Sequence, residues 1–323
     1  MNGIIRRVKA AVSFFLILFC LNFAACVKSS EDFIVYDCFS VNFLDVGEGD
    51  AIFINFNDGN TMLIDCGEKS DKNFTTIKRY INAYSCGTLD YLVLTHPDSD
   101  HVGNAADILD RYDVKTAYIP YLLQPENFSA YYPAYLKIAE KGIGKVSAAG
   151  GVISGEDYYA VFLSPNAQGT TDSAYGAVNS SDTPSKSDIN NVSPIIYLEY
   201  KGVRFVFTGD AGVSQEKVAI NNVKTGIIKR YIKRDINLTG IDFLKVSHHG
   251  AADESGEEFL KALTPKNAVI SVGGENYYGH PAGETLSRIK EASPDCKIYL
   301  TSENGTVSVL VEGSGNIAVK TAA

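Results

Sequence analysis

Short apolar runs separated by polar turns dominate the first part of the chain and predict strands joined in hairpins. Three such runs cover residues 39–46, 51–56 and 61–66, and an Asp-Gly-Asn turn at 58–60 joins the second run to the third. Asp-Gly between two apolar runs is a strong short-range signal for a tight β-turn. The chain therefore enters its fold through antiparallel strands.

Helices begin to alternate with strands beyond residue 67, where the apolar period lengthens to that of a helix. The first predicted helix has its apolar face at Ile77, Tyr80, Ile81 and Tyr84 and ends near Ser85. Further strands are predicted at 89–95, 114–119, 146–153, 158–163, 194–200, 203–207, 241–246, 268–272, 297–301, 305–311 and 316–320. Further helices are predicted at 105–112, 129–141, from 213, 257–263 and 285–291. Hairpins followed by alternating strands and helices, twice over, favour one α/β domain of two β-rich halves with helices outside.

The first 25 residues differ from the rest of the chain and predict a secretory signal peptide. Arg6, Arg7 and Lys9 form a basic head, residues 10–23 are almost wholly apolar, and small residues follow. The apolar stretch is too short for a comfortable transmembrane span. We therefore expect the folded part of the protein to be exported.

Cys26 follows Ala24 and Ala25 directly, which resembles a bacterial lipobox, although Phe23 stands where that motif usually has Leu. On this interpretation Cys26 becomes the lipidated first residue and attaches the protein to the bacterial membrane. Residues 26–38 then form a lipid-anchored tether, and residues 39–323 form the folded domain. Ordinary cleavage near Ala25 and an uncleaved anchor are the alternatives.

The chain is acidic, and its charge argues against general electrostatic binding to nucleic acid. Removal of residues 1–25 takes away three of the 29 basic residues and none of the 38 acidic ones, so the net charge changes from −9 to −12. Because nucleic-acid affinity comes largely from neutralising phosphates, any DNA contact needs a local basic patch. The basic run between Lys224 and Arg234 is one candidate, and it reads equally well as a solvated helix face.

Four cysteines remain once Cys20 is removed with the signal peptide and Cys26 is assigned to lipid: Cys38, Cys66, Cys86 and Cys296. They allow three pairings, and the sequence does not choose among them. Their wide spacing without a Cys-x-x-Cys pair argues against a zinc knuckle. Free thiols and a single disulfide both stay open.

The strongest chemical signal is the turn at residues 95–101, which carries His96, Asp98, Asp100 and His101. It follows a predicted buried strand and precedes a predicted helix, so its side chains can reach a shared point. Neutral imidazole suits Zn, Mn or Fe, and carboxylate adds hard oxygen ligands. A helix cap alone would need only one Asp. The turn therefore predicts a metal site.

Several separated motifs, taken in order, resemble the metallo-β-lactamase superfamily. They are Asp65 at a strand end, the 96–101 cluster, Thr208-Gly209-Asp210 and Ser247-His248-His249-Gly250. Residues 43–51, 92–103, 205–210 and 276–281 are similar more narrowly to the hydrolase domain of ComEC-type competence proteins. This similarity covers roughly residues 40–323, nearly the whole exported part.

The resemblance implies a four-layer αββα sandwich with two divalent metal ions, Zn or Mn, at one edge of the sheets. Residues that match the family's ligands are His96 and Asp98 for the first ion, Asp100, His101 and His248 for the second, and Asp210 as the bridging carboxylate. Asp100 also corresponds to the carboxylate that orients or deprotonates the attacking water. We expect His280 to be a general acid or a phosphate contact, with a purely structural role as the alternative.

Two departures from the superfamily pattern concern the first metal site. Asp98 stands where the commonest motif has His, and no His occurs between His101 and His248; Asn191 or Ser193 occupies that neighbourhood. The first site is therefore more oxygen-rich, which favours Mn or Mg over Zn and predicts weak occupancy.

The sequence alone does not decide the roles of three further features. His249 is expected to support the ligands rather than bind metal, because adjacent residues at a strand end point opposite ways. Asp45 either supports a ligand or caps the glycine turn that follows it. The aperiodic, polar residues 166–191 form either a lid over the site or a tolerated surface insertion.

Three functions compete. The first is an exported metal-dependent phosphodiesterase that cleaves DNA. The second is a hydrolase of another ester, such as cell-surface phosphorylcholine, with an aromatic cage from Tyr121, Tyr131, Tyr132 and Tyr135. The third is a surface lipoprotein without catalytic activity. No protein partner is inferred for any of them.

Overall fold

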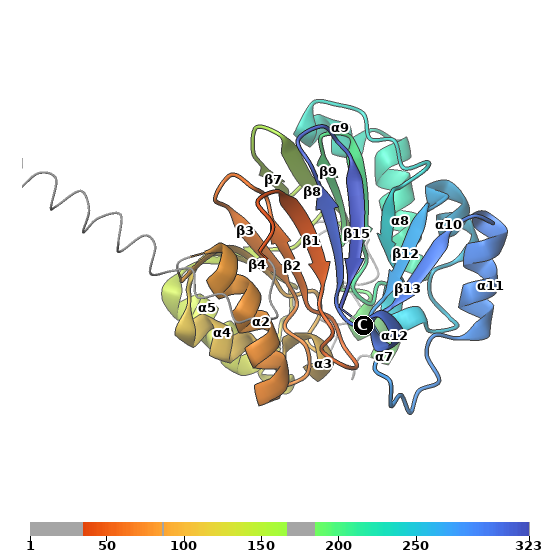
Figure 1. The fold of residues 1–323 in the computed structure, drawn as a ribbon. Helices are drawn as coiled ribbons and strands as arrows, with labels where there is room; N and C mark the ends of the chain where they lie inside the picture. Colours follow the sequence, from red (N-terminus) through yellow and green to blue (C-terminus); the bar gives the residue numbers. More distant parts are fainter. Residues whose placement is uncertain (1–34, 86, 167–184, 323) are drawn as a thin grey trace, which may run out of the picture.

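The computed structural model describes residues 35–85, 87–166 and 185–322, which form two β-sheets packed face to face (Figure 1). The first sheet contains β1 (Phe39–Phe43), β2 (Ile52–Asn55), β3 (Thr61–Ile64), β4 (Thr88–Val93), β5 (Asp113–Ile119), β6 (Gly144–Val146), β14 (Val307–Val311) and β15 (Ile317–Thr321). The second contains β7 (Val152–Ser154), β8 (Tyr158–Ser164), β9 (Ile195–Tyr200), β10 (Val203–Phe207), β11 (Phe243–Lys245), β12 (Asn267–Ile270) and β13 (Lys297–Leu300). Their orders are β15-β14-β1-β2-β3-β4-β5-β6 and β13-β12-β11-β10-β9-β8-β7.

Helices cover the outer face of each sheet (Figure 1). On the first sheet these are α2 (Asp71–Tyr84), α4 (Ala105–Arg111) and α5 (Tyr132–Lys141); on the second they are α8 (Val213–Lys224), α10 (Glu257–Leu263) and α11 (Gly283–Ala292). Shorter elements are α3 (Ser99–Val102), α7 (Lys186–Asn190), α9 (Ile227–Ile232), α12 (Thr301–Asn304), η1 (Pro125–Asn127) and η2 (Ser247–Gly250). A local signal marks the start of α2, which is capped by Ser70, whose side chain accepts from Asn73 N.

Three apolar layers hold the molecule together. The central layer lies between the sheets, where Phe39 stacks on Tyr200 with ring centroids 4.1 Å apart and Phe56 stacks on Tyr158 at 4.0 Å. The other two layers join each sheet to its helices. The inner faces of the two sheets pack together, and helices cover their outer faces. The predicted four-layer αββα sandwich is therefore confirmed.

One predicted strand is divided between the two sheets. The prediction of a single strand at 146–153 is wrong: β6 pairs parallel with β5 in the first sheet, and β7 pairs antiparallel with β8 in the second. The intervening turn is held by Gly150 N, which donates to Phe162 O at 2.9 Å. Gly150 has φ 89°, and a side chain there would meet the Tyr231 ring at 2.5 Å. Continuous apolar character does not reveal a crossover between sheets.

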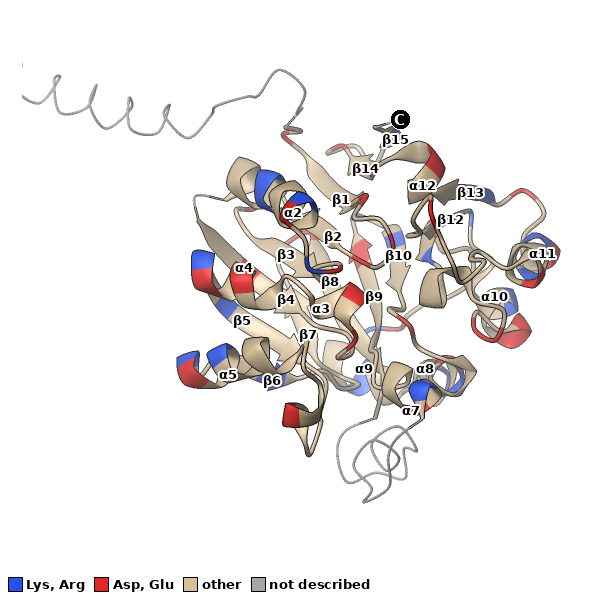
Figure 2. Ribbon diagram, turned by 90° about the horizontal axis from the view of Figure 1, so that it is seen from below, with Lys and Arg blue, Asp and Glu red and all other residues tan. Residues whose placement is uncertain are grey.

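The parallel strand pairs bring their carboxyl ends to one edge of the sandwich. β3 is parallel to β4 in the first sheet, and β10 is parallel to β11 in the second. Asp65, His96, Asp210 and His248 follow these four strands directly in the chain. Figure 2 looks onto this edge, near α3, and shows Lys and Arg mainly on the outer helices.

Several predictions lie outside the described residues. These are the signal peptide, the lipid site at Cys26 and residues 167–184 of the polar loop. In the described part Cys38, Cys66 and Cys296 form no disulfide with one another; Cys86 is not described, so the choice between free thiols and a single disulfide stays open. Among the helices of the described segments, none combines the length and the apolar character needed to cross a bilayer.

Candidate metal centre

Asp65 joins the two ends of the turn that carries the histidines. It is fully buried after β3 with φ 58°, and its Oδ1 accepts from Thr95 N at 2.9 Å. Its Oδ2 accepts from Thr95 Oγ1 at 2.7 Å and lies 2.8 Å from His101 Nδ1. A buried carboxylate with these partners orients the His101 ring, so that Nε2 faces the inside of the site.

The glycine loop after β1 presses against the same turn. Asp50 N donates to Asp100 O at 3.2 Å, and Gly67 N donates to Asp50 O at 2.8 Å. Gly49 has φ 109°, and a Cβ there would lie 2.1 Å from Asp100 O. Only glycine allows this approach, so the loop sets the position of the Asp100 backbone.

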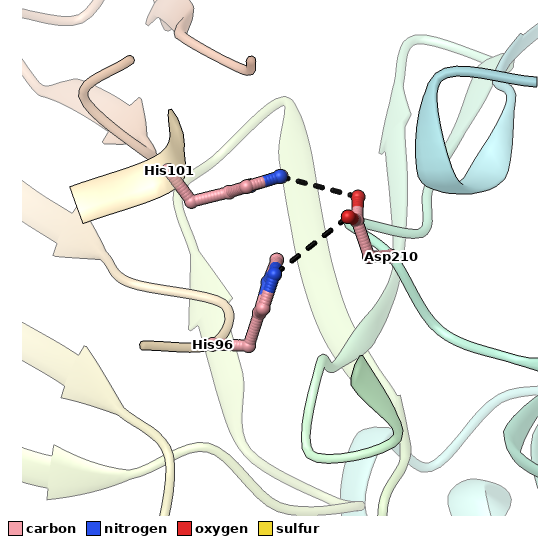
Figure 3. Close-up of side chains that lie close together, drawn as sticks. All are labelled: His96, His101 and Asp210. Atoms are coloured by element: carbon pink, nitrogen blue, oxygen red, sulfur yellow. Dashed lines mark ion pairs between the residues drawn. The ribbon is translucent and has the colours of Figure 1, made fainter. Parts of the chain in front are cut away.

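Asp210 lies between two imidazoles and presents one carboxylate oxygen to each (Figure 3). Its Oδ1 is 3.2 Å from His101 Nε2, and its Oδ2 is 3.6 Å from His96 Nε2. Ser193 Oγ accepts from Asp210 N at 3.3 Å and lies 3.2 Å from His96 Nδ1. A carboxylate that faces two sets of ligands in this way can bridge two ions.

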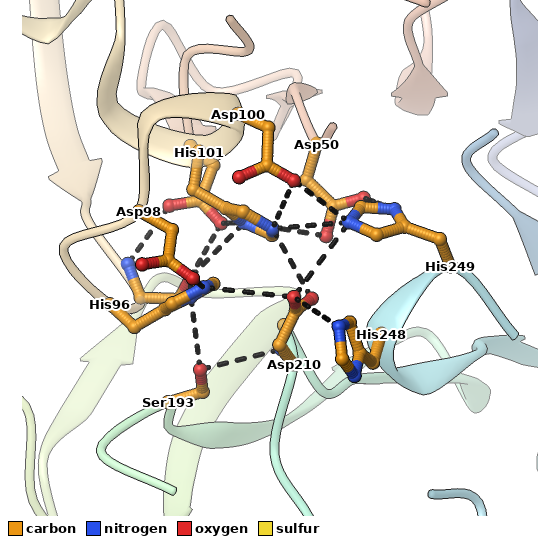
Figure 4. A network of polar contacts seen from close by, with 12 residues as sticks. Asp50, His96, Asp98, Asp100, His101, Ser193, Asp210, His248 and His249 are labelled. Atoms are coloured by element: carbon orange, nitrogen blue, oxygen red, sulfur yellow. Dashed lines mark hydrogen bonds and ion pairs between the residues drawn. The ribbon is translucent and has the colours of Figure 1, made fainter. Parts of the chain in front are cut away.

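His249, rather than His248, has its ring among the predicted ligands of the second ion (Figure 4). His249 Nε2 lies 3.4 Å from Asp100 Oδ2 and 3.3 Å from His101 Nε2. His248 Nε2 lies 3.8 Å from Asp210 Oδ2, while its Nδ1 lies 3.3 Å from Glu254 Oε2 and its side chain is 23% exposed. Both rings thus lie near Asp210, and His249 is the one that also lies beside Asp100 and His101.

The inward position of the His249 ring has a backbone cause. The expectation that adjacent side chains point opposite ways assumed a strand, whereas His248 and His249 lie in the turn η2 with φ 48° and 53°. In this left-handed conformation both rings face Asp210, whose Oδ2 is 3.7 Å from His249 Nε2. Which histidine binds the metal stays a prediction, and the geometry favours His249.

Hydrogen-bond donors and acceptors test whether these residues suit a cation. His101 Nδ1 faces the Asp65 carboxylate and His249 Nδ1 faces Ser271 O at 2.8 Å, so each Nδ1 must carry the proton. In the neutral rings, both Nε2 atoms then present lone pairs to each other at 3.3 Å. Within the described residues, His96 Nε2 and Asp210 Oδ1 are also buried without a hydrogen-bond partner. These groups fit divalent ions, which would satisfy all of them.

In the described part of the chain, three sets of side chains could each hold a metal ion, because the ligand atoms within a set lie within 4.8 Å of one another. They are His96, His101 and Asp210; Asp100, His101 and His249; and Asp50, Asp65 and His101. Burial would raise the pKa of Asp210, but His101, His249 and His96 hold it well below its usual range. Asp210, Asp65 and Asp100 raise the pKa of His101 well above its usual value in spite of burial. Metal binding must therefore displace protons held by the cluster.

The first site contains an ammonium group beside its carboxylate. His96 Nε2 lies 3.2 Å from Asp98 Oδ2, and Lys186 Nζ contacts the same oxygen. Burial raises the pKa of Asp98, yet His96 and Lys186 lower it to about 2. Weak occupancy of this site stays a prediction, and the lysine beside Asp98 agrees with it.

Lys245 and Asp50 form a buried ion pair beneath the centre, and the sequence reasoning assigned them no role. Lys245 is fully buried in β11; its Nζ contacts Asp50 Oδ2, donates to Gly209 O at 3.2 Å and lies 4.0 Å from Asp210 Oδ1. The available signal was a lysine inside the apolar run at 241–246, where an unpaired charge would be expensive.

A cleft of about 550 Å³ opens onto the centre. Its lining includes Glu48, Glu68, Asp98, Asp100, Lys186, Asp210, His248, His249, Tyr278 and His280. The His280 ring lies 5.7 Å from that of His248, so the predicted catalytic histidine does reach the cleft. Asp45 Oδ1 accepts from Gly47 N at 3.2 Å, which supports the glycine-turn cap.

Two predicted substrate-binding features lie elsewhere. The tyrosines proposed as an aromatic cage do not line this cleft in the described structure; Tyr131 is fully buried in the core below α5. The basic run includes α9, at the end of the sheets opposite α3 and α7 in Figure 1. Within it, Lys229 pairs with Asp235 at 2.8 Å. Neither feature lines the cleft in the described structure.

Comparisons with known proteins indicate the family that the chain resembles. The metallo-β-lactamase superfamily model matches residues 44–179. The chain is 28% identical over 295 residues to ComE operon protein 3 of Bacillus subtilis, covering 84% of this chain and 34% of that protein. It is 25% identical over 252 residues to Recombination protein 2 of Haemophilus influenzae, covering 77% and 26%. The chain thus spans about a third of the length of the first relative and about a quarter of the length of the second.

A solved structure supports the fold alone. A mutant of the CmlA β-hydroxylase superposes with a TM-score of 0.50 at 11% identity, covering 88% of this chain and 55% of that one. The family match and the two relatives confirm the resemblance to metallo-β-lactamase-fold, ComEC-like hydrolases.

Proposed function

Taking the chain as a metal-dependent hydrolase of the metallo-β-lactamase fold, we propose that it is an exported phosphodiesterase that cleaves DNA. The observation that carries the proposal is the position of Asp210, whose two oxygens face His96 on one side and His101 on the other. Two ions bridged by one carboxylate can hold both the attacking and the leaving oxygen of an in-line displacement.

Each residue of the centre has a distinct task in this proposal. His96, Asp98 and Asp210 would hold the first ion, and Asp100, His101, His249 and Asp210 the second. When bound, the ions supply a water of lowered pKa and positive charge for the phosphoryl oxygens. Asp100, whose side chain is 29% exposed towards the cleft, accepts a hydrogen bond from the attacking water and orients it.

His280 binds the phosphate from the other wall of the cleft. Burial and the neighbouring His248 and His249 lower the pKa of its ring, so it is neutral near pH 7. In the described structure its Nδ1 is buried without a hydrogen-bond partner. A neutral imidazole can donate one N–H to a phosphate oxygen or to the leaving oxygen.

The cleft is acidic, which limits how the substrate can bind. Glu48, Glu68, Asp98 and Asp100 line it, with Lys186 as one basic side chain among the lining residues. Phosphate affinity must therefore come mainly from the ions, and DNA binding without metal should be weak. The phosphorylcholine alternative loses its proposed aromatic cage, because the four tyrosines do not line the cleft in the described structure.

Hydrolysis assays on metal-loaded protein test the proposal. Purified protein is incubated with single-stranded and double-stranded DNA and with bis(p-nitrophenyl) phosphate, in Mn and in Zn, beside a D210N control. We expect cleavage that D210N abolishes. Bound metal without hydrolysis of any of these phosphodiesters would contradict the proposal and favour the non-catalytic lipoprotein.

Export and membrane attachment are part of the same proposal. They rest on the basic head, the apolar stretch and Cys26 at the start of the chain. Labelling cells with a radioactive fatty acid should mark the wild-type protein and not C26S. Equal recovery of both variants in the cytosol would contradict export.

A further inference from the structure

The loop at residues 273–281 forms one rim of the cleft and is held at both ends. Gly273 N donates to Glu48 Oε2 at 3.0 Å, and a side chain at Gly273 would lie 2.9 Å from Glu48 N. Beyond the loop, Ala282 N donates to Gly250 O at 2.8 Å. The rim is therefore attached to both walls that carry the metal centre.

The tip of the loop has its own internal support. Asn276 Oδ1 accepts from Tyr278 N at 3.0 Å and from His280 N at 3.2 Å, and its amide donates to His280 O. One asparagine side chain thus organises the tip as a compact turn. Side chains at the tip are presented in a defined direction.

Two large aromatic side chains at this tip are open to solvent. Tyr277 is 95% exposed and Tyr278 is 76% exposed. Single exposed aromatic residues are common and need no explanation. Tyr278 differs because, among the large exposed hydrophobic residues of the described segments, it is the one that lines the cleft.

A row of rings connects this tyrosine to the metal centre. Tyr278 stacks on His280 with centroids 5.9 Å apart and planes 13° apart. His280 lies 5.7 Å from His248, and His248 lies 6.1 Å from His249. A phosphate held at the centre would thus have an exposed aromatic face at the end of the same cleft.

We propose that Tyr278 is a stacking platform for a nucleobase next to the scissile phosphodiester, which makes unpaired nucleic acid the substrate. This inference rests on the proposed function, because it assigns the substrate class of the same site. A base inside a duplex stacks on its neighbours, whereas an unpaired base can lay its face on an aromatic ring.

The charge of the cleft strengthens the argument. Its acidic walls, with Glu48 and Glu68 beside Asp98 and Asp100, cannot hold a long stretch of phosphate backbone. Base stacking is a contact without charge that works beside carboxylates. Nucleic-acid affinity here should therefore come from one phosphate at the ions and one base on the tyrosine.

Binding of a labelled, short single-stranded oligonucleotide to metal-loaded protein tests the platform by fluorescence anisotropy. Y278A is expected to weaken binding about 5- to 140-fold, the range for loss of one base stack, while Y278F retains it. Y231A is the matched control, because Tyr231 is also exposed, at 55%, but lies on α9 at the far end of the sheets.

An abasic oligonucleotide provides the second arm. Wild type should bind it more weakly than the normal strand, and Y278A should bind both equally, because the base and the ring are two halves of one contact. Equal oligonucleotide binding by Y278A and wild type, no oligonucleotide binding by wild type, or competition by phosphorylcholine and not by mononucleotides would overturn the inference. Tyr278-dependent binding without cleavage would refute the phosphodiesterase and leave the platform standing.

Discussion

The Nε2 atoms of His101 and His249 face each other across 3.3 Å, and each ring has its Nδ1 on a hydrogen-bond acceptor. Once the protons held by these two rings are displaced, both Nε2 lone pairs can bind one divalent cation. The pair joins the first sheet's turn to the second sheet's turn, so metal binding should also tie the two halves together.

The two neighbouring histidines should differ in their effect on metal affinity. H249A removes a ring that converges with Asp100 and His101, and we expect metal affinity to fall by more than about 100-fold, beyond the range for supporting residues. H248A removes a ring paired with Glu254 and should weaken metal binding by about tenfold or less. Competition with a chromophoric chelator measures both. A larger loss in H248A would restore the order expected from the sequence.

The buried pair of Lys245 and Asp50 should stabilise the fold only as a pair. K245M removes the cation in direct contact with the buried Asp50 carboxylate and leaves only His101 and His249, each 3.9 Å away, so we expect a loss of about 3–5 kcal/mol in the free energy of unfolding. The double variant D50N/K245M removes both charges and should recover most of that loss. Urea denaturation of metal-free protein gives the values.

The control for this pair is K261M, which breaks the exposed contact between Lys261 and Glu257 and should leave the unfolding curve unchanged. If D50N/K245M is no more stable than K245M, the charges are not compensating each other.

Glu216 should make stability depend on pH. Burial raises the pKa of its carboxyl from 4.5 to about 7, although Gly256 N donates to it at 2.8 Å. A raised folded-state pKa contributes stability that is complete below pH 4.5 and is lost as pH rises through about 7. E216Q keeps an acceptor oxygen and cannot ionise. We expect it to match wild type near pH 4.5 and exceed it above pH 8, by on the order of 3 kcal/mol.

Unfolding of metal-free protein across this pH range measures the effect. E257Q, at an exposed carboxyl on α10, serves as the comparison and should follow the wild-type pH profile. Parallel profiles for wild type and E216Q would show that Glu216 does not titrate there.

Gly49 should be required for the metal centre rather than for the turn alone. In G49A the new methyl group would overlap Asp100 O, so we expect both lower stability and weaker metal binding. G59A places alanine at a similar positive φ, 91°, with nothing within 4 Å of the new methyl group. It should carry the backbone cost of about 1–2 kcal/mol and bind metal normally. Equal metal affinity in the two variants would exclude the proposed contact.

Most secondary structure was readable from the sequence because it depends on local pattern. The helix predicted at 257–263 is α10 itself, and nearly every predicted strand is present within a few residues. The prediction of a single strand at 146–153 is wrong because the apolar pattern is the same whether both ends of the segment pair in one sheet or in two different sheets. A segment's hydrophobic period predicts a strand but does not reveal which other strands it pairs with.

The sequence predicted which residues contribute to the site but not how their side chains are arranged. Residue type and order predict a metal centre from the turn at 95–101, Asp210 and the two histidines at 248–249. Which histidine faces the second ion depends on the left-handed turn at η2, which a strand-based expectation cannot foresee. Lys245 and Tyr278 had no assigned role, because one needs Asp50 from the opposite sheet and the other needs the cleft.

The sequence by itself determined the kind of fold and the kind of chemistry, since both follow from short-range periodicity and from residue types at fixed spacing. Only the tertiary structure decided the geometry. It brought four strand ends from two sheets to one edge, set His249 opposite His101, and put Tyr278 at the rim. The physical reason is that metal affinity and substrate choice depend on distances of a few ångströms between residues far apart in the chain.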